Sequence, residues 1–151
     1  MGDVNFNELL SVQVESAERP KNFPIGHYES VVQSHEMKES SQKGTPFVRF
    51  WVKLIGPGED VEDEPFQEAG GMDALRERKP LWMDYYITKD ALYRLREFLQ
   101  DGLGLSCEGR NFDEVIPEST NAPLTVHVRH RAGQKEGEFF MDLDDYMKAA
   151  A

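Results

Sequence analysis

The fold is decided most directly by residues 47–55, which read FVRFWVKLI. Side chains that follow one another along a β-strand point to opposite faces. Every second residue from Val48 to Leu54 is apolar. The alternate residues are Phe47, Arg49, Trp51 and Lys53. The segment therefore predicts a strand with one face in the core and one face that alternates aromatic and basic side chains.

The aromatic and basic face is typical of a surface that binds single-stranded nucleic acid. Aromatic rings stack on bases with little regard to sequence, for about 1–3 kcal/mol each, and cations between them neutralise phosphates. The alternative is structural: Trp51 packs under a loop or helix, while Arg49 and Lys53 are merely solvated. One strand does not decide between these two interpretations.

Further strands are predicted on both sides of this one. They cover residues 27–37, 81–87, 124–131 and 138–143. A Ser/Gly/Lys turn at residues 38–46 makes the first two strands a hairpin, and a glycine-bounded loop at residues 133–137 does the same for the last two.

One helix is predicted over residues 89–101. Its apolar residues recur at helical spacing, namely Ala91, Leu92, Leu95, Phe98 and Leu99. Thr88 is expected to be the N-cap, and Gly102 is expected to adopt the left-handed conformation at the C-terminal end.

The element order predicts a five-stranded Greek-key barrel of the oligonucleotide-binding (OB) type, with its helix between strands three and four. An immunoglobulin-like sandwich would lack the helix. A ferredoxin-like fold would need a helix between early strands, where the sequence has Gly, Pro and acids. We expect the barrel to span residues 25–143, between an irregular N-terminal arm, residues 1–24, and a C-terminal tail, residues 144–151.

An OB barrel binds along strands two and three, flanked by the loops that follow strands one and four. Candidate binding residues on these elements, besides Phe47, Arg49, Trp51 and Lys53, are Trp82, Tyr86, His127, Arg129, Arg131, Lys43 and Lys135. The two tryptophan-bearing strands supply rings, the fourth strand supplies an outward basic row, and each loop supplies one lysine.

The net charge of −11 argues at first against a polyanionic ligand. The acids are segregated, however: residues 57–77 carry −7, residues 1–24 carry −2 and residues 136–151 carry −4, which leaves +2 for the rest of the chain. We expect a slightly basic sheet and a mobile acidic insert at residues 57–79. Such an insert is either a solvated loop or a competitor for the protein's own basic groove.

No enzyme motif is present: the chain lacks a P-loop, a GxSxG elbow, an HExxH helix and a CxxC pair. His127 and His130 should face opposite sides of a strand, and Asp142, Asp144 and Asp145 lack convergent partners, so neither zinc nor magnesium is expected. The sequence therefore predicts no catalytic residue, no metal and no cofactor.

Localisation is expected to be intracellular. The single cysteine, Cys107, cannot form an intramolecular disulfide, and no apolar run resembles a signal peptide or a membrane span. We therefore expect a soluble protein with no membrane partner.

Three stretches carry a family resemblance: NFNELL at residues 5–10, FPIGHY at residues 23–28 and KGTPFVRFWV at residues 43–52. With the later helix and strand, they make residues 5–131 similar to a family of small phage and prophage proteins encoded among recombination and replication genes. The resemblance implies an OB-like single-stranded DNA-binding protein that works with phage replication or recombination proteins in the host cytoplasm. Unlike many phage binders, the chain ends in MKAAA, with its acids upstream.

Two other classes of protein stay open. One is an adaptor or inhibitor whose acidic segment, residues 57–77, mimics nucleic acid; it predicts that an apolar patch is the largest exposed feature. The other is a virion or assembly component whose sheet edges meet neighbouring subunits, which predicts a large stable oligomer.

Overall fold

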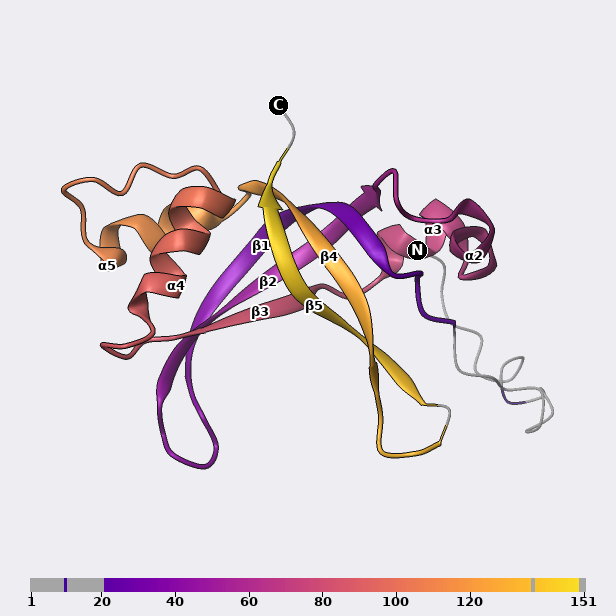
Figure 1. The fold of residues 1–151 in the computed structure, drawn as a ribbon, viewed down its shortest axis with the longest axis horizontal. Coiled ribbons are helices and arrows are strands. Elements are labelled where there is room, and N and C mark those ends of the chain that lie inside the picture. The colour runs from indigo at the N-terminus through magenta and orange to yellow at the C-terminus, as the bar shows by residue number, and fades with distance from the viewer. Residues whose placement is uncertain (1–9, 11–20, 137, 150–151) are drawn as a thin grey trace.

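The structure, a computed structural model, describes residue 10 and residues 21–136 and 138–149. One antiparallel sheet of five strands, in the order β3-β2-β1-β4-β5, forms its centre (Figure 1). The strands are β1 (Gly26–Glu39), β2 (Pro46–Pro57), β3 (Leu81–Tyr86), β4 (Pro123–Ala132) and β5 (Phe139–Lys148). The predicted mainly β fold with five strands is confirmed. Closure into a barrel is not seen, because no hydrogen-bonded ladder joins β3 to β5 within the described residues.

The sheet contains two hairpins, β1–β2 and β4–β5, which are joined by pairing of the long central strand β1 with β4. β1 pairs with β2 over nearly its whole length and with β4 through residues 26–31. Register shifts near Ser30 and Gln33 mark β-bulges, which bend and twist a strand. Figure 1 shows the β1–β2 and β4–β5 hairpins projecting from the same side of the molecule.

The core lies on the predicted face of β2. Val48, Phe50, Val52 and Leu54 are all buried, as their alternation indicates. Phe98 lies against this face, with its ring centroid 4.8 Å from that of Phe50. Leu95 and Leu99, predicted on the same helix face, are also buried.

The predicted helix at residues 89–101 is shorter and differently wound. α4 (Leu92–Glu97) begins after Ala91 and continues as a π-helical turn, η2 (Phe98–Gly102). The prediction that Thr88 is the N-cap is therefore wrong, because Ala91 holds that position. The carbonyl oxygen of Thr88 accepts hydrogen bonds from the backbone N–H groups of Ala91 and Leu92. The left-handed glycine is Gly104, at φ 69°, and not Gly102.

Gly102 is required for a different reason, a close approach to β5. A Cβ atom at this position would lie 2.8 Å from ring carbons of Tyr146. We predict that Gly102→Ala destabilises the fold by about 1–3 kcal/mol, the usual effect of overpacking. Urea unfolding measures the change. Gly56→Ala in β2 is the control, since a Cβ there meets nothing within 4 Å; equal stability of the two variants would contradict the prediction.

The acidic insert contains two helices, α2 (Asp63–Glu68) and α3 (Gly71–Glu77). The expectation that no helix lies between the early strands is therefore wrong. Phe66 and Leu75 are buried in the core, 2% and 0% exposed, while all the acids of the insert remain exposed. Phe66 and Leu75, with partly buried apolar residues around them, anchor these short helices, and the surrounding charges hide that signal in the sequence.

The C-terminal region also differs from the prediction. β5 runs through residue 148, so residues 144–148 are strand and not tail. The polar stretch before β4 contains α5 (Phe112–Val115) and a 3₁₀ turn, η3 (Ile116–Ser119). Most of the predicted N-terminal arm lies outside the described residues. Within those residues, no helix is long and apolar enough to cross a bilayer.

Candidate nucleic-acid interface

The outer face of β2 and β3 brings two tryptophans and an arginine together. Trp51 lies opposite Trp82 in the ladder, and their rings meet edge to face at a centroid distance of 5.7 Å. The guanidinium carbon of Arg49 lies 5.5 Å from the Trp51 ring and 5.0 Å from the Trp82 ring. Cation–π attraction favours this arrangement. We call these three residues the Trp–Arg cluster.

Arg49 is held in place by its cross-strand partner. Its Nε and Nη2 atoms donate to the two carboxylate oxygens of Asp84 at 2.8 and 2.9 Å, a bidentate pair. Hydrogen bonding to Asp84 raises the pKa of Arg49 above its ordinary value. The pair fixes the guanidinium between the rings, and it also neutralises the charge predicted to meet a phosphate.

The aromatic side chains of the face differ in exposure. Trp82 and Tyr86 are 42% and 48% exposed. Trp51 is half-buried, and its indole Nε1 donates to Glu36 at 3.0 Å. Phe47, predicted to face outward, is buried because Tyr86 packs on its ring at 5.7 Å and Arg49 covers it. The exposed stacking surface is therefore mainly Trp82 and Tyr86.

Lys53 was predicted to present its ammonium group on the outward face, but this group is turned to the backbone of the acidic insert. Its Nζ donates to the backbone carbonyl oxygens of Leu75 at 3.1 Å, Arg76 at 2.8 Å and Arg78. Burial, with a smaller contribution from the nearby Arg78 charge, lowers the pKa of Lys53. An ammonium group has three donors, so these three carbonyls satisfy it. Lys53 ties the C-terminal end of α3 to β2.

A groove of about 800 Å³ opens beside the Trp–Arg cluster. It is lined by Gln33, Ser34, Trp51, Glu77, Arg78, Lys79, Pro80, Leu81 and Trp82. Sequence reasoning missed Gln33, which lies at a β-bulge, and the basic pair Arg78 and Lys79. The sequence did offer one indication that Arg78 and Lys79 belong to the site: they come directly before the strand that carries Trp82.

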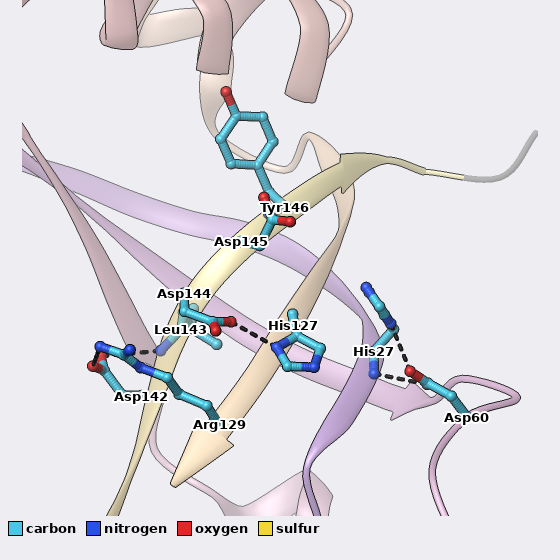
Figure 2. A network of polar contacts seen from close by, with 9 residues as sticks. All are labelled: His27, Asp60, His127, Arg129, Asp142, Leu143, Asp144, Asp145 and Tyr146. Carbon is cyan, nitrogen blue, oxygen red and sulfur yellow. Dashed lines mark hydrogen bonds and ion pairs between the residues drawn. The ribbon is translucent and has the colours of Figure 1, made fainter. Parts of the chain in front are cut away.

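The basic row on β4 is paired with acids on β5 (Figure 2). Arg129 donates to Asp142 at 3.1 Å, and Arg131 lies 3.9 Å from the same carboxylate. The ring of His127 is hydrogen-bonded to Asp144 at 2.6 Å. The outward position of these residues is as predicted, but each of these side chains has a carboxylate neighbour, so they do not form an arginine-lined groove.

A hollow with acidic walls lies between β3 and β5, and Trp82 also lines it. It has a volume of about 310 Å³ and lies between the unpaired edges of β3 and β5, where Asp84, Asp142, Asp144 and Asp145 all line it. The acids of β5 therefore lie between the basic side chains of β4 and Trp82 of the Trp–Arg cluster. The structure brings together the candidates on β2 and β3, but it does not add His127, Arg129 or Arg131 to them.

The two loop lysines lie at different hairpins, and both are exposed. Lys43 lines a hollow of about 450 Å³ together with Tyr86, so it extends the β2–β3 face. Lys135 lies in the loop after β4. Within the described ranges, no three His, Cys, Asp or Glu side chains are grouped so that they could hold a metal ion.

Asp60 in the acidic insert is anchored to β1 (Figure 2). Its carboxylate accepts the backbone N–H of His27 at 2.8 Å and contacts the ring Nδ1 at 2.7 Å. These hydrogen bonds from His27 lower the pKa of Asp60. The folded state therefore holds the ionised carboxylate more firmly than the unfolded chain does.

We predict that this contact is sensitive to acid. Because the folded pKa lies below the unfolded value of about 3.9, the contact stabilises the protein above that pH and is lost as pH falls through the folded pKa. Asp60→Asn should therefore lower stability at pH 6 and make less difference towards pH 3. Urea unfolding of both proteins across this range measures the effect. A stability difference that is constant with pH would contradict it.

Comparison with known proteins finds no family model that matches the chain and no significantly similar sequence among curated proteins.

Proposed function

We propose that the protein binds single-stranded DNA on the outer face of β2 and β3, with little regard to sequence, and that its fold is OB-like. The strand order β3-β2-β1-β4-β5, with a helix between β3 and β4, supports the fold proposal. OB folds are partly open Greek-key barrels that bind along strands two and three. The open β3–β5 edge is compatible with this architecture.

The Trp–Arg cluster beside the large groove is the observation that carries the proposal. Trp82 exposes 42% of its surface, and the Arg49 guanidinium contacts both indole rings. Exposed rings of this kind stack on unpaired bases for about 1–3 kcal/mol per base. Because Arg49, Arg129 and Lys53 are already satisfied within the protein, stacking contributes more to the proposed binding than the sequence alone indicated.

The biological setting is part of the same proposal. The resemblance of residues 5–131 to small phage and prophage proteins supports a role in phage DNA replication or recombination in the host cytoplasm. As part of this role, we propose that the protein interacts with phage replication or recombination proteins and with further copies of itself.

Fluorescence anisotropy tests the proposal with labelled oligo(dT), oligo(U) and a duplex of equal length. We expect oligo(dT) to bind, and the duplex to bind much more weakly because its bases are already stacked. The ratio of oligo(dT) to oligo(U) affinity then gives the preference for DNA over RNA. If oligo(dT) shows no measurable binding at low salt, the proposed function is wrong.

A second candidate function is favoured by the acidic insert. Its exposed acids are carried on α2 and α3, which Phe66 and Leu75 anchor to the core. A fixed array of carboxylates suits an inhibitor that mimics nucleic acid better than a loose loop would. Under this alternative, oligo(dT) does not bind, and charge reversal of the insert acids removes binding to a basic protein partner.

A further inference from the structure

The cations predicted to meet phosphate are largely satisfied within the protein. Arg49 is paired with Asp84, and Arg129 with Asp142. Lys53 donates to three backbone carbonyls. A single-strand site still needs positive groups near its stacking rings, because phosphates follow every base.

Arg78 and Lys79 meet this need. Both line the groove that contains Trp51 and Trp82. The Nε atom of Arg78 is buried without a hydrogen-bond partner, and neither residue forms an ion pair within the described part of the chain. A half-buried cation without a partner is unfavourable, and a bound anion offsets that cost.

Lys53 adds positive electrostatic potential beside Arg78 and Lys79. The ammonium group of Lys53 lies on the carbonyl of Arg78, and the Arg78 charge contributes to lowering the pKa of Lys53, after the larger effect of burial. Burial also lowers the pKa of Arg78. One acid, Glu77, lines the groove as well and opposes anion binding.

Resting on the proposed function, we infer that Arg78 and Lys79 form the phosphate-binding subsite of the interface and that Lys53 is the residue that positions them. The acidic insert then builds the site instead of competing with it. Lys53 holds the backbone at the end of α3 by its hydrogen bonds to the carbonyl oxygens there. The backbone that follows is thereby positioned so that Arg78 and Lys79 line the groove.

The salt dependence of oligo(dT) affinity tests the subsite. Each phosphate neutralised on a single strand contributes about 0.7 to the magnitude of the slope of log affinity against log salt. Arg78→Gln/Lys79→Gln should therefore lower that magnitude by about 1.4. Lys89→Gln, which removes an exposed charge outside the groove, is the matched control and should leave it unchanged. Glu77→Gln should tighten binding at low salt.

The role of Lys53 needs a double-mutant comparison. Lys53→Met should reduce the slope much as the double glutamine variant does, because Arg78 and Lys79 lose their anchor. Added to Arg78→Gln/Lys79→Gln, it should cause no further reduction. A further reduction of about 0.7 on that background would show that Lys53 itself contacts phosphate and would overturn its positioning role.

If Lys53→Met fails to fold, the phosphate-binding subsite can still be tested by a measurement on Arg78 in the wild-type protein. The NMR signal of the Arg78 Nε–H group in the wild-type protein should shift when oligo(dT) is added. If that signal and the salt slope of the Gln variant both stay unchanged while Trp82→Ala still weakens binding, the subsite is wrong and the proposed function stands. If the wild-type protein binds no oligo(dT), the proposed function itself has failed.

Discussion

Phe98→Ala is expected to destabilise the protein by about 3–5 kcal/mol, the usual range for removing a buried aromatic side chain. The Phe98 ring is fully buried. Its centroid lies 4.8 Å from that of Tyr85 on β3 and 5.2 Å from that of Tyr146 on β5. Since domains of this size have about 5–15 kcal/mol of stability in total, the variant should lose a large part of it.

Phe98→Ala should also loosen the packing between β3 and β5, besides lowering the stability of the whole domain. β3 and β5 share no ladder in the described structure, and Phe98 bridges these edges because Tyr85 and Tyr146 both pack on its ring. Burial raises the pKa of Tyr85 and of Tyr146 above the ordinary tyrosine value. In Phe98→Ala both phenols should ionise at lower pH than in the wild type.

Urea unfolding and ultraviolet titration of tyrosine measure these two effects. Phe139→Ala is the control for aromatic loss, because Phe139 is 48% exposed at the start of β5. If Phe98→Ala unfolded at the same urea concentration as the Phe139 control, the helix would not be the link between the two strand edges.

Patterns carried by neighbouring residues could be predicted from the sequence. The alternation in β2 identified its buried face, because successive side chains of any strand point to opposite sides. The spacing of Leu95, Phe98 and Leu99 identified the buried face of the helix. It could not reveal the π-helical turn, because one extra residue in a turn leaves this apolar pattern almost unchanged.

Contacts that depend on strand register or on distant segments could not be predicted. Arg49 meets Asp84 only because β2 and β3 pair in one particular register. Lys53 meets the end of α3 only because apolar residues such as Phe66 and Leu75 pack the acidic insert onto the core. The late part of β5 was missed because the register shift opposite His127 and Val128 breaks the alternation on which the prediction relied.

These errors share a physical cause that bears on the site. A side chain's position along a strand predicts which face it occupies, but its charge is available only if no partner reaches it. At this interface the partners are a cross-strand carboxylate and three backbone carbonyls, both of which come from tertiary structure. The predicted face was therefore correct for Arg49 and Trp51, while partners that the sequence did not predict hold Arg49 and Lys53.

Trp82→Ala is expected to weaken oligo(dT) binding by about 1–3 kcal/mol, the range measured for loss of one stacking ring. The folded state should lose little stability, since 42% of the side chain is exposed. Trp51→Ala should weaken binding over the same range but also lower stability, because its indole is half-buried and donates to Glu36. Trp82→Ala is thus the cleaner test of the stacking surface.

Two properties of the chain make this test direct. The protein has only two tryptophans, and both belong to the Trp–Arg cluster, so quenching of intrinsic fluorescence reports on the proposed site without a label. Tyr93→Ala is the control, because Tyr93 is 47% exposed on α4, away from the β2–β3 face. Oligo(dT) should quench the wild type and the Tyr93 variant alike, and should quench Trp82→Ala only at higher oligonucleotide concentration. A folded Trp82→Ala protein that binds as tightly as the wild type would remove the β2–β3 face from the binding site.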